Sequence, residues 1–322
     1  MASLLSVENL QVQFQTKKGI NTAVDGVSFS VEKGRILGIV GESGCGKSVT
    51  SMSILQLLGS NARISGGSIK LDGKELIGLP EKEMCRIRGN DIAMIFQDPM
   101  TALNPTLTIG TQLIEPIMLH QNCGKKEAWT RAVDVLKRVG IAAPEKRMKE
   151  YPHQLSGGMR QRVMIAMAVS CEPRLLIADE PTTALDVTIQ AQILELMCEL
   201  REKMGTAIML ITHDMGVVAE TADDVLVLYA GKAVEYGSIE DIFERPKHPY
   251  TQGLLNSIPR LDEDVELLNT IEGTVPAPDA MPAGCRFAPR CPYGKDRCMK
   301  EKPGVYHAGN SLVSCFRYEG EK

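Results

Sequence analysis

The stretch GESGCGKS, residues 41–48, constrains the fold of this chain more than any other. It follows the continuous apolar run RILGIVG, residues 35–41, which is typical of a buried strand in a parallel sheet. A helical pattern, KSVTSMSILQLL, comes directly after it. A glycine-rich turn between such a strand and such a helix points backbone N–H groups inward at a positive helix end. The sequence therefore predicts a phosphate-binding loop in an α/β domain.

The residue types of this loop predict its tasks. Lys47 is expected to reach the β- and γ-phosphates of a bound nucleotide, and the Ser48 hydroxyl to bind Mg²⁺. The other residues expected to surround the phosphates are Gly41, Ser43, Gly44, Cys45, Gly46 and Val49.

Two adjacent carboxylates end the apolar run LLIADE, residues 175–180. Two acidic residues alone could form a solvated strand end, but a phosphate loop in the same chain favours a catalytic interpretation. Asp179 is then expected to hold Mg²⁺ through water, and Glu180 to polarise the water that attacks the γ-phosphate. The pair predicts hydrolysis of a nucleoside triphosphate.

Composition and charge exclude several classes of protein. The 322 residues, 43% of them hydrophobic, suffice for a large core. A net charge of −4 without a basic tract gives no electrostatic footprint for nucleic acid. The N-terminus lacks a signal-peptide pattern, and the longest uncharged apolar run, VMIAMAV, is far shorter than the about 20 residues of a membrane span. Nine cysteines, five of them scattered, argue against a disulfide framework, so we expect a reducing cytoplasm.

The order of patterns along the chain predicts an α/β sheet with an appendage. Strand patterns recur at 175–179, 207–212 and 224–231, with a helical pattern at 188–204. After residue 245 the chain becomes proline-rich, which breaks long elements. We therefore expect one domain over residues 1–245 and a C-terminal extension over residues 246–322.

With LSGGMRQR at residues 155–162, the motifs resemble the ATP-binding cassette (ABC) ATPases over roughly residues 4–245. The resemblance implies a phosphate-loop cassette with a mixed core sheet, a β subdomain and a helical subdomain at about 100–170. Cassettes of this family pair head to tail, so that the signature of one closes over the ATP on the phosphate loop of the other. The signature residues here are Ser156, Gly157 and Gly158, which open a helix and could meet a γ-phosphate.

The same resemblance implies roles for four further residues. Gln97 would contact the metal and water and relay to the membrane partner, and Asp186 would lie in the loop that crosses the cassette pair. His213 would grip the γ-phosphate, as a second catalytic residue beside Glu180. Phe14 would stack on adenine, although it also fits an ordinary core position in an alternating strand.

Other parts of the sequence indicate which cassette ATPase this chain resembles. It lacks the long heptad pattern of DNA-repair and chromosome ATPases, and it has one phosphate loop where translation factors usually have two. The segment FQDPMTALNP resembles the importer branch of the cassettes. The segments RPKHPYTQGLL and GCRFAPRC resemble the C-terminal extension of the dipeptide and oligopeptide importers, to which the nickel importers are closely related. Within RPKHPYTQGLL, Pro249 is expected to extend the backbone at His248 in a simple turn.

The resemblance implies a subunit that binds and hydrolyses ATP to energise peptide import from the cytoplasmic face of the cell membrane, where it is peripheral. The implied partners are a second cassette ATPase that is a different chain, giving a heterodimer, two integral-membrane permeases and, through them, a substrate-binding protein. A nickel-importer ATPase and a non-transport ABC ATPase remain alternatives.

Four cysteines crowd the end of the chain in GCRFAPRCPYGKDRC and shortly after it: Cys285, Cys291, Cys298 and Cys315. Free core thiols are an alternative, but this tail has few large apolar residues and would gain from a metal centre. Zinc usually takes a close pair of cysteines, whereas these are widely spaced. The spacing therefore favours an iron–sulfur cluster, [4Fe-4S], over Zn²⁺. Three arginines could offset the charge of such a cluster: Arg286, Arg290 and Arg297. A structural role is expected, with redox sensing left open.

Overall fold

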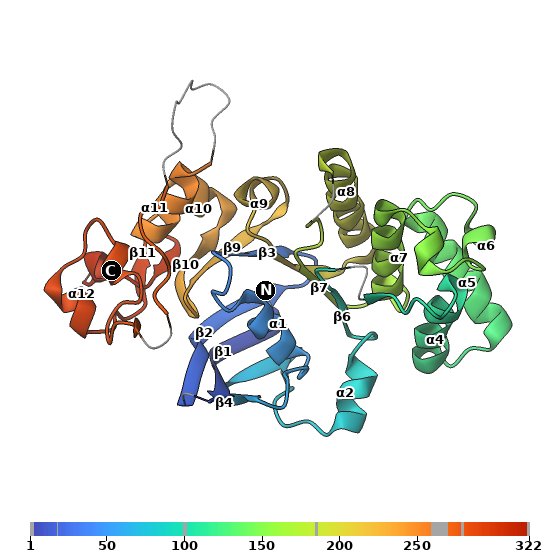
Figure 1. Ribbon diagram of the computed structural model, residues 1–322, viewed down its shortest axis with the longest axis horizontal. Coiled ribbons are helices and arrows are strands. Elements are labelled where there is room, and N and C mark those ends of the chain that lie inside the picture. Colours follow the sequence, from blue (N-terminus) through green and yellow to red (C-terminus); the bar gives the residue numbers. More distant parts are fainter. Residues whose placement is uncertain are drawn as a thin grey trace. The chain divides into compact units, whose positions relative to one another are not determined.

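The computed structural model describes residues 3–17, 19–98, 102–183, 186–258, 270–277 and 280–320. The chain forms two compact units that alternate along the sequence (Figure 1). The first unit contains Glu32–Arg35 and Gly78–Ile211. The second contains Ser3–Val31, Ile36–Ile77 and the chain from Thr212 onward.

An antiparallel sheet begins the second unit. Its strands stand in the order β2, β1, β4, β5, and their bounds are β1 Ser3–Thr16, β2 Gly19–Glu32, β4 Ala62–Leu71 and β5 Lys74–Glu75. The apolar residues of β1 face the core, with Leu10 and Val12 fully buried. The alternation of apolar and polar residues in this strand follows from the period of two along a half-buried strand.

A second group of strands in this unit starts at the phosphate loop. The order is β11 (Tyr306–Ala308), β12 (Ser311–Val313), β10 (Lys232–Ser238), β9 (Asp224–Tyr229) and β3 (Ile36–Val40). The pair β3 and β9 is parallel, and the pairs from β9 outward are antiparallel. The last two strands of the chain, β11 and β12, therefore belong to the same set of hydrogen-bonded strands as β3, which precedes the phosphate loop.

Short helices complete the second unit: α1 Lys47–Ile54, α9 Met215–Thr221, α10 Ile239–Glu244, α11 Pro249–Asn256 and α12 Asp296–Lys300, with 3₁₀ turns at Ala288–Arg290 and Phe316–Tyr318. The segment that we expected to form a simple turn at His248 instead begins α11. His248 is extended, as predicted, but its Nδ1 accepts a hydrogen bond of 3.1 Å from the Tyr250 N–H and so caps the helix.

The first unit combines a parallel sheet with a helical region (Figure 1). Its strands stand in the order β8 (Ala207–Ile211), β7 (Leu175–Asp179) and β6 (Ile92–Ile95). Both pairs are parallel, and β7 and β8 are completely buried. Continuous apolar sequence in these strands is expected, because helices cover both faces of a parallel sheet.

The helices of this unit are α2 Glu81–Ile87, α4 Ile109–Gln121, α5 Lys125–Arg138, α6 Pro144–Arg147, α7 Gly157–Val169 and α8 Val187–Met204, with a 3₁₀ turn at Pro152–Gln154. Helices α4, α5 and α7 pack together. Across the described residues, no helix is both long enough and apolar enough to pass through a bilayer. The predicted α/β class is confirmed, while the division at residues 245 and 246 stays a prediction.

Candidate functional site

The predicted phosphate loop joins β3 to α1 in the second unit. At Gly41 the backbone has a φ of +149°, and a Cβ atom would lie 2.1 Å from the Leu228 carbonyl oxygen, so a side chain does not fit. Gly46 caps α1 in the left-handed conformation. The buried Lys47 turns back over the loop, where its Nζ donates to the carbonyls of Gly41 at 2.7 Å and Glu42 at 3.2 Å. The loop therefore curls around the ammonium group of Lys47.

The other predicted members of the loop divide into an exposed and a buried set. Ser43, Gly44 and Ser48 are exposed, and Val49 is half-buried. Cys45 is buried, and burial raises the pKa of its thiol, which stays protonated as a packing group. The exposed side of the loop therefore carries the Ser48 hydroxyl that we predicted to bind Mg²⁺.

Glu180 lies at the end of β7 in the first unit, directly after Asp179, which is buried. Its carboxylate Oε2 accepts hydrogen bonds from Gln97 Nε2 at 2.9 Å and from Thr183 Oγ1 at 3.0 Å. Gln97 follows β6, the parallel neighbour of β7, so the two strand ends bring these side chains together. Thr183 was missed at the sequence level, although a hydroxyl three residues after the acidic pair was a usable signal.

The signature and Asp186 open two helices of the first unit. Ser156 caps α7 by accepting from the Met159 N–H at 3.4 Å, and Asp186 caps α8 by accepting from the Ile189 N–H at 3.0 Å. Gly157 stands in open space, whereas a Cβ on Gly158 would lie 3.2 Å from the Ile189 side chain. The two helix starts are therefore neighbours. Ser156, Gly157 and Asp186 are exposed there.

Buried Gln161 connects α7 to the segment that follows Glu180, because its Nε2 donates to the carbonyl of Pro181. Two other predicted residues belong to the second unit. Phe14 is half-buried near the end of β1, opposite Ala62 of β4, and His213 is exposed just before α9. Their predicted contacts with adenine and with the γ-phosphate stay predictions.

The four C-terminal cysteines line a single cavity of about 80 Å³ in the second unit, and within the described residues they are thiols without disulfides. The Cys285 N–H donates to the Cys298 carbonyl at 2.7 Å. Burial and the three neighbouring thiols raise the pKa of Cys285 to about 11. Among the residues that the structure describes, no group of three or more His, Cys, Asp or Glu side chains is arranged to hold a metal ion. The thiols are thus gathered as predicted, but the structure does not show a metal centre.

Contacts that the sequence did not predict connect the C-terminal extension to the phosphate loop. The Glu42 N–H donates to Tyr250 Oη at 2.9 Å, and Arg290 Nη1 donates to both carboxylate oxygens of Glu42 at 2.9 and 3.0 Å. The sequence offered only a weak signal for them, because 208 and 248 positions separate these partners along the chain.

Two family models match the chain. Residues 24–183 match the family described as ABC transporter, and residues 234–298 match the family described as Oligopeptide/dipeptide transporter, C-terminal region.

Similar proteins support both matches. The chain is 56% identical to the oligopeptide transport ATP-binding protein AppD of Bacillus subtilis, over 100% of this chain and 98% of that protein. It is 51% identical to the oligopeptide transport ATP-binding protein OppD of Escherichia coli, over 98% of this chain and 93% of that protein.

Solved structures agree. The ATP-binding cassette MJ0796, a dimer in a post-hydrolysis state bound to ADP and Pi, matches with a TM-score of 0.66 at 27% identity, over 73% of this chain and 98% of that chain. The chain therefore belongs to the ABC transporter ATPases, and within them to the oligopeptide/dipeptide transporter family.

Proposed function

We propose that this chain binds and hydrolyses ATP to energise the import of dipeptides and oligopeptides. The observation that carries the proposal is the presence, in one chain, of a cassette and of a C-terminal region that matches the oligopeptide/dipeptide transporter family. Similar proteins that bear oligopeptide or dipeptide transport names align over nearly the whole chain. The cargo is proposed by this similarity, because an ATPase subunit does not itself contact the transported molecule.

The proposed chemistry assigns one task to each side chain. Lys47 and Ser48 bind the phosphates and Mg²⁺, Asp179 holds the metal through water, and Glu180 polarises the attacking water. The hydrogen bonds from Gln97 and Thr183 support this role of Glu180, because they fix the carboxylate oxygen at one position.

The proposed partners rest on the similarity to ATP-binding proteins of peptide transport, and the exposed signature is compatible with a cassette pair. A second, different cassette would cover the phosphate loop with its own signature, and the exposed Ser156, Gly157 and Asp186 would meet that partner. Two integral-membrane permeases, a substrate-binding protein and a peripheral position at the cytoplasmic face complete the proposal.

Uptake assays test the cargo. Deleting the gene should abolish uptake of a labelled dipeptide, and the wild-type gene should restore uptake, whereas a gene carrying Lys47→Ala should not. Loss of Ni²⁺ uptake with normal dipeptide uptake would instead support a nickel importer.

Hydrolysis assays test the partner. The isolated chain should hydrolyse ATP slowly, with specific activity that rises with its own concentration or on addition of the second cassette and the permeases. Full activity at every concentration, in protein that light scattering shows to be monomeric, would contradict head-to-tail pairing.

We also propose that the four cysteines bind a [4Fe-4S] cluster, with Zn²⁺ as the alternative. Four thiols around one cavity are soft ligands that suit iron–sulfur clusters or zinc. When bound, the cluster would join four distant points of the extension and act as a structural staple.

Metal analysis of anaerobically purified protein tests this assignment. Brown protein with about four irons and four sulfides per chain is expected, and changing any of the four cysteines to Ser should remove the colour. Cys85→Ser is the matched control, because Cys85 is exposed in the first unit. Colourless protein with one zinc ion and no sulfide would refute the iron–sulfur assignment, while a structural metal site at these cysteines would still stand.

A further inference from the structure

Glu42, the second residue of the phosphate loop, is held through all of its polar groups. Its N–H donates to Tyr250 Oη at 2.9 Å. Its carbonyl accepts from Lys47 Nζ and from the Cys45 N–H, both at 3.2 Å. Its carboxylate accepts from Arg290 Nη1 at 2.9 and 3.0 Å. One loop residue therefore joins the phosphate-facing cation to two residues of the C-terminal extension.

Tyr250 is itself rigidly placed. Its side chain is fully buried, and its ring packs against Tyr229, with 4.7 Å between centroids, and against Phe287, at 5.4 Å. Burial raises the pKa of the Tyr250 hydroxyl, so this group stays neutral and can accept the Glu42 N–H. The ring stack therefore sets the position of the hydroxyl, and the hydroxyl sets the position of the loop backbone.

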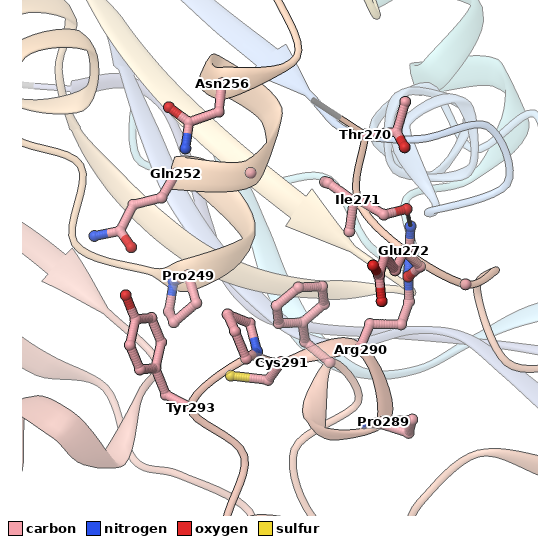
Figure 2. Close-up of a pocket in the computed structure, with 14 residues that line it drawn as sticks. Pro249, Gln252, Asn256, Thr270, Ile271, Glu272, Pro289, Arg290, Cys291 and Tyr293 are labelled. Atoms are coloured by element: carbon pink, nitrogen blue, oxygen red, sulfur yellow. Dashed lines mark hydrogen bonds between the residues drawn. The ribbon is translucent and has the colours of Figure 1, made fainter. Parts of the chain in front are cut away.

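Arg290 is fixed in the same way. Its side chain is 6% exposed, and its Nε and Nη2 donate to the carbonyls of Glu272 at 3.0 Å and Ile271 at 3.2 Å. Figure 2 shows Arg290 beside these two residues at the wall of a pocket of about 620 Å³. Because the backbone of the extension holds the other guanidinium nitrogens, Nη1 is directed at Glu42 in a defined orientation.

The negative charge of Glu42 explains why its ion pair with Arg290 matters for phosphate binding. A carboxylate in a loop that receives the phosphates of ATP would repel them. Arg290 neutralises that carboxylate at a site where both side chains are largely shielded from water, with exposures of 6% and 29%. The extension thus supplies both a shape constraint and a compensating charge to the loop.

We infer that Tyr250 and Arg290 are positioning residues for ATP binding, which set the backbone and the charge of the phosphate loop through Glu42. The inference rests on the proposed binding of ATP phosphates by residues 41–48, and it does not depend on the cargo.

Substituting Arg290 tests the charge. In the full-length chain, Arg290→Gln should weaken ATP binding, measured by equilibrium titration, by roughly tenfold or more. This is the scale expected for lost hydrogen bonds to a charged group. The double substitution of Arg290→Gln with Glu42→Gln should recover most of the affinity, because the unpaired carboxylate is gone. Arg147→Gln is the matched control: Arg147 Nη1 donates to both oxygens of Glu150, at 2.9 and 2.8 Å, in the first unit.

Substituting Tyr250 tests the backbone. Tyr250→Phe removes only the acceptor of the Glu42 N–H and should weaken ATP binding about three- to tenfold. In the assembled transporter, KM for ATP should rise while kcat stays near that of the wild type. Tyr318→Phe is the control, because the Tyr318 hydroxyl donates to the carbonyl of Lys247 at 3.0 Å and not to the loop.

The wild type and Lys47→Ala separate this inference from the proposed function. If the wild type itself does not bind ATP, the proposed function fails. If the wild type binds ATP, Lys47→Ala does not, and Arg290→Gln and Tyr250→Phe bind like the wild type, the inference is wrong. It is also wrong if the double variant stays as weak as Arg290→Gln, because a general loss of structure would then explain the defect.

Discussion

Replacing Glu180 by glutamine should stop hydrolysis without preventing ATP binding. In the structure, one carboxylate oxygen of Glu180 accepts from Gln97 Nε2 at 2.9 Å and from Thr183 Oγ1 at 3.0 Å. The amide oxygen of glutamine can accept both bonds, so the side chain should keep its position. It cannot attract a proton from water as a carboxylate does, so only the chemical step should be impaired.

The expected size of the effect follows from this geometry. A positioned general base contributes about 10²–10⁴ in rate, which corresponds to about 2.7–5.4 kcal/mol of barrier. Thr183→Val leaves the carboxylate in place and removes the hydrogen bond that it accepts from Thr183 Oγ1. A single hydrogen bond is worth about 1 kcal/mol, so that variant should lose only about fivefold in rate.

Phosphate release at saturating ATP in the assembled transporter measures both effects, and equilibrium titration measures binding. Glu172→Gln serves as the control, because the Glu172 carboxylate is exposed and pairs with Arg138 at 3.3 Å on the surface. The reasoning fails if Glu180→Gln hydrolyses ATP at the wild-type rate, or if Thr183→Val is slower than Glu180→Gln.

Three further changes have defined outcomes. Gly41→Ala should abolish ATP binding and lower the melting temperature, because its Cβ would lie 2.1 Å from the Leu228 carbonyl oxygen; titration and thermal melting check this. Phe14→Ala should weaken the binding of ATP by about 1–3 kcal/mol, the scale of base stacking, and leave the binding of tripolyphosphate unchanged. An equal loss of affinity for both ligands would indicate that Phe14 is a core residue. Phe287→Ala should lower the free energy of unfolding of the second unit by about 3–5 kcal/mol, because this ring is 2% exposed and packs on Tyr229. Denaturant unfolding measures this, and an unchanged denaturation midpoint would show that the stacked rings do not stabilise the unit.

Sequence reasoning predicted the central strands well because their signal is local. The apolar run at 175–179 matches β7, and the patterns at 207–212 and 224–231 contain β8 and β9. Each strand is buried on both faces, so nearly every residue is apolar and the run has clear ends. The run LLIADE likewise pointed to Glu180, and the resemblance to the ABC ATPases pointed to Gln97; the structure joins these two side chains by a hydrogen bond.

The C-terminal extension was harder to predict because its stabilising contacts are not local. Strands β11 and β12 have three residues each, too few to show a period. Strand β12 pairs with β10, where Val313 lies opposite Glu235, and β11 in turn pairs with β12. The contacts of Arg290 with Glu42 also join distant parts of the chain, and no sequence pattern specifies such a pair.

These long-range contacts form a continuous path from the last strands to the phosphate loop. Buried Glu235, on the strand that pairs with β12, accepts the N–H groups of Lys247 at 2.7 Å and His248 at 2.9 Å. His248 caps α11, whose first turn carries Tyr250, and the hydroxyl of Tyr250 holds the loop. Each link orders the next one, so residues on both sides of the composition change at position 245 stabilise one another. Beyond position 245 the proline-rich sequence no longer shows patterns that predict helices or strands. The tertiary contacts of the second unit nevertheless include residues on both sides of this position.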